Sequence, residues 1–363
     1  MRTKRGVWII VAAVAVLLAA GTGFVLTLRS DSGEPTAAPA PSTPAPSAAA
    51  PSASTAPPAG ADITGPLDLL LIGVDTRISI PDWQPHADAI MLLHVGADLR
   101  SGYLYSLPRD LRVDVPAFAR NGYRGGRHKL TEAMSYGAKV PGTDKANVAQ
   151  GYELLARTIS RYTGIEKFDA GAILTFNGLS KLTDALGGVT MTIDQKVVSQ
   201  HRRPDGTART LRPGGGGYVG PQATYLPGTR RLVGWQAIDY ARQRYTAGGD
   251  YTRQRHQRQL VKALLTKAED AGLATDRSKL ESVLTALGDT LVFSGERTPL
   301  EYAYALRELR PSQLTSVSLP GRSVFNGGYI GEQLDASGRA FLKAVATGDP
   351  ASYLAKHPDL ISK

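Results

Sequence analysis

The sequence predicts a three-layer α/β/α domain with a central mixed sheet, preceded by one transmembrane helix and a disordered linker. Two observations support this prediction. Between residues 62 and 363, short apolar strand patterns alternate with amphipathic helix patterns, which is typical of a sheet covered by helices on both faces. Residues 1–61 instead contain one long apolar run and then a segment made almost wholly of Pro, Ala, Ser and Thr.

Residues 6–28 contain no charged side chain and are long enough to cross a bilayer as a helix, which takes about 20 apolar residues. Three basic residues precede this run: Arg2, Lys4 and Arg5. Residues 1–5 should therefore stay in the cytoplasm, and the remainder should face outward from the cell membrane. A cleaved secretory signal peptide is the alternative, and it would also export the rest of the chain.

The segment 29–61 is read as a Pro/Ala/Ser-rich spacer, because it has too little apolar surface to fold and its prolines keep it extended. The chain carries a net charge of +10, of which +2 belongs to residues 1–61, so residues 62–363 carry +8. A basic exported domain suits anionic lipids, wall polymers or phosphorylated metabolites, and nucleic acid is not expected as a partner. With no cysteine, the chain has no disulfide, thiolate nucleophile or cysteine zinc site.

Three strands open the domain. Residues 67–75 form a short, mostly apolar run that suits a strand buried on both faces, and residues 89–95 and 102–110 follow as the next two strands. A helix comes later, with one apolar face. Its apolar positions fall at steps of four, three, four and three: Val148, Tyr152, Leu155, Ile159 and Tyr162. Gly164 should end it.

The second half of the domain continues the alternation. Residues 176–188 predict a helix stopped by the glycine pair at its end, and residues 189–194 predict a strand. Residues 200–229 are rich in Gly and Pro and form a long irregular insertion, of the kind that tends to be functional or mobile. Helices follow at 234–242 and from Asp250 to 270, with Asp250 as N-cap of the latter. The tail, 270–363, mixes helical patterns with a strand at 314–320.

Two acids stand at strand ends, Asp75 after the first strand and Asp88 before the second. Ligands of open α/β sheets commonly bind at strand ends, and two carboxylates with water and phosphate oxygens suit a magnesium ion. The alternative is that both acids only cap local structure. Arg77 and Arg109 lie near the same ends, where each could also pair with a surface acid.

Residues 240–259 hold five arginines, one histidine and a single acid, Asp250. Such crowding favours a planar, multiply charged anion, which guanidinium groups bind well. Arg242, Arg244 and Arg253 are the candidates, with Gln257 on the same helix face as Arg253 and Lys129 as a further charge. We expect Arg255 and Arg258 on a solvated face, and His256, flanked by arginines, to be disfavoured as a cation. Neither a G-x-S-x-G elbow nor an H-E-x-x-H zinc motif is present.

Seven blocks in order resemble the LytR-CpsA-Psr family of membrane-anchored cell-wall enzymes: LLLIGVDTR, ADAIMLLHV, SLPRDLRVDVP, KLTEAMSYG, LTDALGGVTMTI, GWQAIDYARQR and GGDYTRQRHQRQ. They span about residues 69–259. Four positions depart from the family's common pattern: His86, Ala89, Thr131 and His256 stand where arginine, threonine, asparagine and arginine are frequent. The departures at His86 and His256, and the neighbouring Arg255, concern individual roles and leave the overall site in place.

The resemblance implies transfer of a glycopolymer from a polyprenyl-diphosphate carrier to a peptidoglycan hydroxyl, with release of polyprenyl phosphate. It implies that Asp75 and Asp88 hold magnesium, with manganese as the alternative. It also implies that five arginines grip the diphosphate, supported by Lys129 and Gln257: Arg77, Arg109, Arg242, Arg244 and Arg253. The isoprenoid tail would lie in an apolar groove beside the sheet. No oligomeric state is implied.

Catalytic roles are assigned to Asp75, Asp88, Arg109, Arg242 and Arg244, with Asp88 or Asp75 as the base for the acceptor hydroxyl. Two other functions use the same residues in part. A pyrophosphatase would use water as the acceptor. A wall-polymer-binding or regulatory module would need the basic surface but not the two carboxylates.

Overall fold

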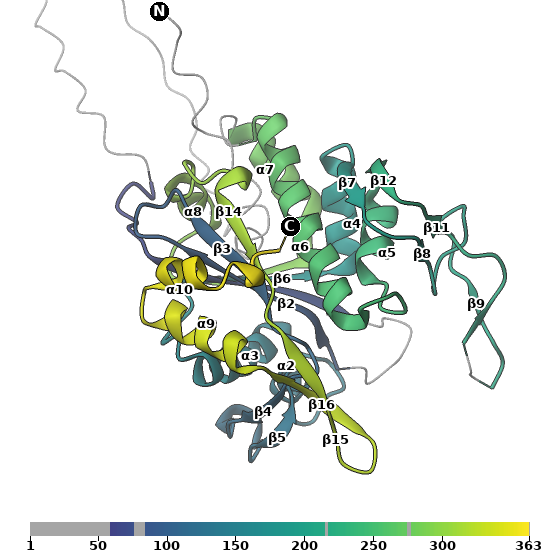
Figure 1. The fold of residues 1–363 in the computed structure, drawn as a ribbon, viewed down its shortest axis with the longest axis horizontal. Coiled ribbons are helices and arrows are strands. Elements are labelled where there is room, and N and C mark those ends of the chain that lie inside the picture. The colour runs from purple at the N-terminus through teal and green to yellow at the C-terminus, as the bar shows by residue number, and fades with distance from the viewer. Residues whose placement is uncertain (1–58, 76–83, 215–216, 274–276, 363) are drawn as a thin grey trace, which may run out of the picture.

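The computed structural model describes residues 59–75, 84–214, 217–273 and 277–362. A six-stranded mixed sheet runs through its centre (Figure 1). The strand order is β13 (Leu291–Gly295), β6 (Ala170–Thr175), β1 (Leu67–Asp75), β2 (His86–Val95), β3 (Gly102–Ser106) and β14 (Leu314–Val317). Strand β2 is antiparallel to both β1 and β3, whereas β6 is parallel to β1 and β14 is parallel to β3. The predicted central mixed sheet is confirmed.

The two faces of the sheet each carry their own hydrophobic core, because successive side chains of a strand point to opposite faces. Leu69 and Leu71 of β1 belong to one cluster, and Leu70 and Ile72 belong to the other. The first cluster is covered by α4 (Phe176–Ala185), α5 (Gly234–Arg242), α6 (Gly249–Asp270), α7 (Arg277–Leu287) and α8 (Pro299–Ala305). The second is covered by α2 (Leu130–Ala138), α3 (Val148–Thr163), α9 (Ala336–Ala346) and α10 (Pro350–Lys356). The domain therefore has three layers, as predicted.

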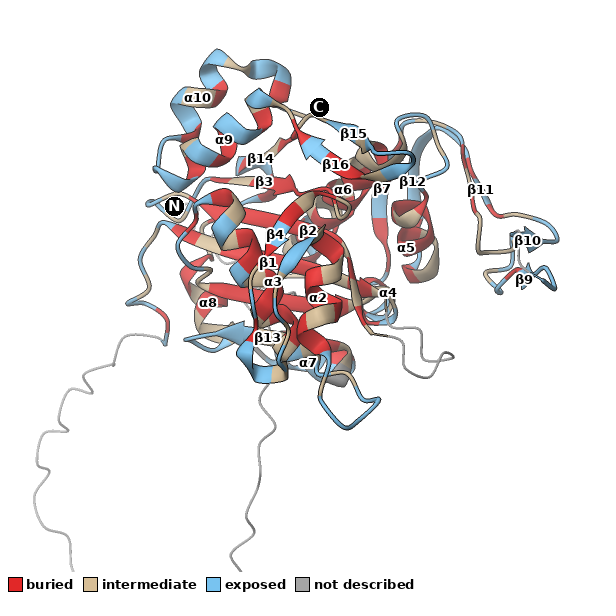
Figure 2. Ribbon diagram, turned by 90° about the horizontal axis from the view of Figure 1, so that it is seen from below, coloured by how far each residue is buried: buried red, intermediate tan, exposed pale blue. Residues whose placement is uncertain are grey.

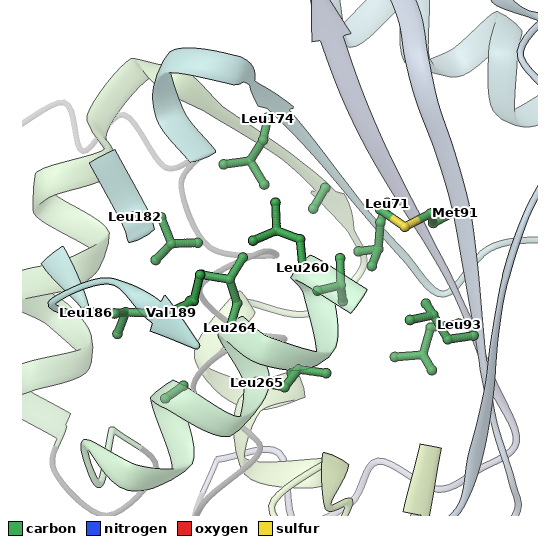
Figure 3. Close-up of a cluster of buried hydrophobic side chains, with 14 of the residues drawn as sticks. Leu71, Met91, Leu93, Leu174, Leu182, Leu186, Val189, Leu260, Leu264 and Leu265 are labelled. Atoms are coloured by element: carbon green, nitrogen blue, oxygen red, sulfur yellow. The ribbon is translucent and has the colours of Figure 1, made fainter. Parts of the chain in front are cut away.

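Helix α6 forms the centre of the first cluster. Figure 3 shows Leu260 and Leu264 of α6 between Leu71 of the sheet and Leu182 of α4. Leu264 and Leu260 are at most 2% exposed. The start of α6 is thereby fixed against the ends of β1 and β2, which is where the predicted site residues lie.

Glycines mark the ends of α3 and α4 and the start of α6. The two ends were predicted, and the start was not. Gly164 ends α3 in the left-handed conformation (φ 82°), and Gly187 and Gly188 (φ 76° and 86°) follow the end of α4. The prediction that Asp250 caps α6 is wrong, since Gly248 (φ 81°) occupies that position. A left-handed turn at Gly248 starts the helix earlier and places Asp250 in its first turn.

Two strand boundaries also differ from the prediction. Strand β3 ends at Ser106 instead of Asp110, because Leu107 makes the last hydrogen bond to Ile90 of β2 and Pro108 has no N–H to continue the ladder. Strand β2 begins at His86 instead of Ala89 and includes Asp88 within its length. Asp88 is therefore part of the strand and does not cap it.

The predicted strand at 189–194 is β7 (Val189–Ile193), which pairs with β12 (Gly228–Leu232) outside the central sheet. Between them, the insertion contains short paired strands and projects from the domain (Figures 1 and 2). These strands are β8 (Val197–Val198), β9 (Thr210–Leu211), β10 (Tyr218–Val219) and β11 (Thr224–Tyr225). The prediction of a long irregular insertion is confirmed.

Several elements had no counterpart in the sequence-based prediction. Two hairpins are β4 (Arg112–Val115) with β5 (Gly126–Lys129), and β15 (Gly321–Phe325) with β16 (Tyr329–Leu334). Short 3-10 helices lie at Ala119–Asn121, Gly288–Thr290, Pro311–Gln313 and Pro358–Leu360. The predicted strand at 314–320 is the shorter β14.

The expected transmembrane helix, residues 6–28, and residues 29–58 of the expected linker lie outside the described residues. Within the described part of the chain, no helix combines the length and the apolar character needed to cross a membrane.

We expect Gly171→Ala to destabilise the fold by about 1–3 kcal/mol, the usual cost of overpacking. A Cβ at Gly171 of β6 would lie 2.0 to 2.5 Å from the phenol of Tyr152, which α3 presses onto the sheet. Urea unfolding would measure the loss. Gly328→Ala is the matched control, because a Cβ there meets nothing within 4 Å. Equal stability of the two variants would contradict the tight α3–β6 contact.

Candidate functional site

A cavity of about 340 Å³ lies where the ends of β1 and β2 meet the loop between α5 and α6. We call it the arginine cleft. Seven of the predicted site residues line it: Asp75, Asp88, Arg109, Arg242, Arg244, Arg253 and Gln257. Residues from four separate stretches of the chain thus converge on one place.

The two acids reach the cleft through the pairing of β1 with β2. These strands are antiparallel, and their register shifts between Gly73 and Val74, which lie opposite Ala89 and Ala87 respectively. Asp88 is skipped by this pairing and is the extra residue of a β-bulge.

The bulge decides which face Asp88 occupies. In a regular strand, Asp88 would lie on the same face as Ile90, which packs in the core under α2 and α3. The inserted residue instead turns Asp88 toward the opposite face. Asp75 already lies on that face, because it is in step with Leu71 along β1. Both carboxylates therefore line the cleft.

Arg109 forms an ion pair with Asp88 and lies 3.6 Å from the carboxylate of Asp110. Its backbone is fixed by the start of α2, since the N–H of Thr131 donates to the carbonyl of Arg109 at 2.8 Å. Burial alone would lower the pKa of Arg109, but Asp88 and Asp110 outweigh it and hold the pKa above its usual value. The guanidinium is thus a fixed cation.

Arg242, the last residue of α5, lies against an aromatic ring. Its guanidinium carbon is 3.7 Å from the ring centroid of Phe176, a cation–π contact. Burial lowers the pKa of Arg242, and the charges of Asp75 and Asp88 oppose this shift. The influence of both acids on Arg242 agrees with their common location in the cleft.

Arg253 is 5% exposed and pairs with Asp250 at 2.6 Å, so Asp250 orients its guanidinium. Burial lowers the pKa of Arg253, and Arg109 and Arg244 lower it further. Its Nε has no hydrogen-bond partner among the described residues. Arg244 is exposed, with its guanidinium carbon 5.3 Å from the Tyr245 ring. Together these groups leave donors available to an anion.

The remaining predicted residues lie at three different places. Gln257 is buried one helical turn after Arg253 and lines the cleft. Lys129 is outside the cleft lining: its Nζ lies 3.6 Å from Asp110 and 4.8 Å from the ring centroid of Tyr329. It is joined to the site through Asp110, which also contacts Arg109. Arg77 lies outside the described residues.

The sequence did not indicate several residues that complete the cleft. They are Phe176, Gln200, His201, Gly217, Tyr218, Gln243 and Tyr245. Gln243 joins the insertion to α5, because its amide donates to Asp239 and its carbonyl accepts from the N–H of Gln200. Only the unusual length of the insertion hinted that it would take part.

A second cavity of about 290 Å³, here called the side cavity, adjoins the cleft and shares four residues with it: Phe176, His201, Tyr218 and Arg242. Trp235, Asn177 and Ser180 also line it. Aromatic rings and polar side chains are therefore combined beside the arginines.

An apolar groove opens on another side of the cleft. It lies between the sheet and helices α4, α5 and α6, and it shares Phe176, Arg242 and Gln257 with the cleft. Its other lining residues are Leu71, Ile72, Gly73, Ala89, Met91, Leu174, Leu179, Ile238, Ala241, Leu260 and Val261. The small residues Gly73 and Ala89 lie between the apolar residues and the two acids along β1 and β2.

The donor set fits a magnesium ion only together with a ligand. Asp75 and Asp88 supply two carboxylates, and among the described residues no group of three or more His, Cys, Asp or Glu side chains could hold a metal. Magnesium commonly takes one or two carboxylates with waters and substrate phosphates, so the pair is sufficient for a phosphate-bridged ion.

The sequence predicted a solvated face for Arg255 and Arg258; Arg255 is partly exposed, whereas the prediction is wrong for Arg258. Arg258 is 3% exposed, because the segments around Ser106, Ser318 and Ser362 cover it. Arg255 pairs with Asp194, whose other oxygen lies 3.0 Å from Nε2 of His256. Burial lowers the pKa of His256, in agreement with its predicted neutral state.

The fold and the cleft define a class of protein: an α/β/α domain with a cluster of arginines and carboxylates beside an apolar groove. The profile of the LytR_cpsA_psr family matches residues 30–339. The chain belongs to this family, and the resemblance seen in the sequence is confirmed.

Individual proteins also match the sequence of this chain. Biofilm regulatory protein A of Streptococcus mutans is 29% identical over 276 residues, covering 73% of this chain and 59% of the relative. The chain thus spans about three fifths of that protein. The polyisoprenyl-teichoic acid–peptidoglycan teichoic acid transferase TagU of Enterococcus faecalis is 26% identical over 255 residues, covering 69% of this chain and 70% of the relative.

Solved structures share the fold. Protein gbs0355 of Streptococcus agalactiae superposes with a TM-score of 0.58 at 22% identity, covering 78% of this chain and 87% of the other. TagT bound to LI-WTA gives a TM-score of 0.53 at 20% identity, covering 78% and 90%. The mixed α/β fold is therefore common to all three.

We expect His201 to titrate near pH 4. Burial, and then the charge of Arg242, lowers the pKa of His201 from 6.5 to about 4. Between pH 6.5 and 4 the unfolded chain therefore binds a proton that the folded chain does not, so folding stability falls as the pH falls through this window. NMR titration of the imidazole, assigned with His201→Gln, measures the midpoint. A midpoint near 6.5 would show that His201 does not face the arginines.

Proposed function

We propose that this protein is a membrane-anchored phosphotransferase that moves a glycopolymer from a polyprenyl-diphosphate carrier to a peptidoglycan hydroxyl, releasing polyprenyl phosphate. The observation that supports this most is the continuity between the arginine cleft and the apolar groove, which share Phe176, Arg242 and Gln257. A polyprenyl diphosphate has a charged head joined directly to an apolar tail. The two parts match the two adjoining sites.

The cleft suits a diphosphate for electrostatic reasons. Arg242 and Arg253 are both held in surroundings that lower their pKa, chiefly by burial, and Arg253 is also repelled by Arg109 and Arg244. Planar guanidinium forks match phosphate oxygens in pairs, and a ligand with two phosphate groups would relieve the repulsion. A carboxylate ligand brings less charge and fewer acceptor oxygens.

In the proposed reaction the acceptor oxygen attacks the phosphorus atom next to the sugar. A new P–O bond forms as the bond from this phosphorus to the bridging oxygen breaks, and polyprenyl phosphate leaves with the electron pair. The acceptor proton passes to Asp75 or Asp88. The arginines stabilise the charge on the leaving oxygen, the main contribution a protein makes to phosphoryl-type transfer.

Asp75 and Asp88 would hold magnesium, or manganese, beside the diphosphate, where the ion would neutralise phosphate oxygens. Asp88 is already paired with Arg109. The Asp88 carboxylate would thus both position Arg109 and serve as a metal ligand. The side cavity gives room for the sugar next to the phosphate, with Trp235 and Tyr218 in its lining.

The named activity of a relative supports the proposal. TagU of Enterococcus faecalis is a polyisoprenyl-teichoic acid–peptidoglycan teichoic acid transferase, and TagT, which shares the fold, has been solved bound to LI-WTA. With residues 6–28 as anchor, the cleft would face the outside of the cell membrane, where peptidoglycan lies. A pyrophosphatase and a binding module remain the alternatives.

We expect Arg242→Ala and Arg244→Ala each to lower the rate of polyprenyl phosphate release by about a thousandfold or more, the range seen for arginines that stabilise phosphoryl transfer. The fold should survive, because Arg244 is exposed and Arg242 makes no ion pair shorter than 4 Å within the described residues. The assay is turnover of a polyprenyl-diphosphate-linked saccharide with peptidoglycan and magnesium.

Arg231→Ala is the matched control, since Arg231 is exposed and lines neither the cleft nor the groove, and its side chain, in the described part of the chain, hydrogen-bonds only the carbonyl of Gly187. Near-normal turnover in both cleft variants would defeat the arginine assignment. Equal product with and without peptidoglycan would identify a pyrophosphatase. Unchanged binding in Asp75→Ala, with no product in any condition, would identify a binding module.

We expect Ala89→Leu to weaken the apparent affinity for the polyprenyl donor at least about tenfold. The larger side chain would fill the groove next to Gly73 and displace a few buried methylene groups of the tail, worth about 0.8 kcal/mol each. KM should rise more for a long-chain donor than for one with a short lipid. Ala119→Leu, at an exposed position, serves as control. An equal effect on both donors would place the tail elsewhere.

A further inference from the structure

A cavity of about 510 Å³, here called the rear cavity, lies on the side of α6 away from the arginine cleft. At 100° per residue, Arg253 and Gln257 point to one side of the helix, whereas Arg258 and Lys262 point to nearly the opposite side. The cavity is bounded by α6, by β7 and by the segments around Ser316 and Ser362. Its lining residues are Thr190, Met191, Thr192, Asp194, Arg255, Arg258, Gln259, Lys262, Ala263, Thr266, Ser316 and Ser362.

Arg258 is the unusual member of this lining. It is 3% exposed, and within the described ranges its guanidinium donates only to serine hydroxyls, those of Ser106, Ser318 and Ser362, at 2.9 to 3.3 Å. Its Nε has no hydrogen-bond partner among the described residues. A buried charge is costly unless an opposite charge accompanies it, and hydroxyl dipoles do not neutralise it.

The electrostatic surroundings agree. Burial lowers the pKa of Arg258 to about 10, and the only charge that also affects it is that of Arg255. No carboxylate among the described residues pairs with Arg258. The one acid of the lining, Asp194, is already shared by Arg255 and His256. Counted over the residues that the structure describes, the rear cavity therefore has an excess of positive charge.

Further donors surround the same space. The ammonium of Lys262 is half-buried and bonds the carbonyl of Leu314 at 3.1 Å, which leaves two of its three hydrogens for other acceptors. Hydroxyl groups come from two elements: Thr190 and Thr192 of β7, and Ser316 of β14. Cations and hydroxyls together are the usual donors for a phosphate group.

We propose that the rear cavity binds a phosphate-type oxyanion, held by Arg258 and Lys262, at a site separate from the arginine cleft. The bound group supplies the negative charge that offsets the buried charge of Arg258. A cavity of this volume accommodates a phosphodiester with a small unit on each side as well as free phosphate. The proposal does not depend on the transfer reaction, because it concerns binding alone.

A reporter at this site tests the proposal on the full chain in detergent. The chain has no cysteine, so Thr266→Cys at the exposed rim of the cavity gives a single labelling position for an environment-sensitive fluorophore. Titration with inorganic phosphate at constant ionic strength should produce a saturable change. Arg258→Gln should weaken it at least about tenfold and Lys262→Gln about threefold or more, as charge-assisted hydrogen bonds are lost.

Arg244→Gln is the matched control, because it removes a cation of the cleft and should leave this titration unchanged. Circular dichroism checks the fold, and if Arg258→Gln fails to fold, Lys262→Gln decides alone, with calorimetry on the unlabelled chain as confirmation. The absence of a saturable change in the parent overturns the proposal. So does a titration that both rear-cavity variants leave within twofold of the parent.

Two further titrations identify the ligand chemistry. Glycerophosphoglycerol binding as tightly as phosphate would indicate a polymer phosphodiester as the natural source, whereas binding of inorganic phosphate alone would indicate the free ion. Acetate is the control for a simple carboxylate. If acetate binds as well as phosphate, the assignment of a phosphate-type anion is overturned.

Discussion

The arrangement of the arginine cleft depends on one irregularity of the sheet, the bulge at Asp88. Without it, the carboxylate of Asp88 would be turned into the core beneath α2 and α3, where an unpaired charge is costly. With it, Asp88 lies on the face of Asp75 and pairs with Arg109 from the end of β3. The bulge therefore brings charged side chains of β1, β2 and the loop after β3 together in the cleft. Helix α6 adds Arg253 to this group.

Helix α6 explains how this chain accommodates so many arginines close together. The ones that neighbour each other in sequence are separated by the turn of the helix: Arg253 faces the cleft, Arg255 reaches Asp194, and Arg258 faces the rear cavity. Asp250 and Asp194 each neutralise one of them. What remains is an excess of positive charge on each side of the helix, which favours a separate anion on each.

The sequence predicted the elements that have strong local patterns. The strand of residues 67–75 and the helix ended by Gly164 are found as expected, because a buried strand and an amphipathic helix are both encoded within their own residues. The expectation for Arg258 failed because burial there comes from Ser106, Ser318 and Ser362, which are distant in the chain. The contributions of His201 and Tyr218 were missed because the insertion has no periodicity.

The three adjoining cavities differ in the chemistry of their linings. The apolar groove, the arginine cleft and the side cavity meet at Phe176 and Arg242, which line all three. A chain that binds only a polymer has no use for the groove, and one that binds only a lipid has no use for the aromatic and polar lining around Trp235. A molecule with an apolar tail, a diphosphate and a sugar would make use of every part. Since Arg242 lies at the junction and against the Phe176 ring, the proposed function would place the charged centre of such a molecule beside it.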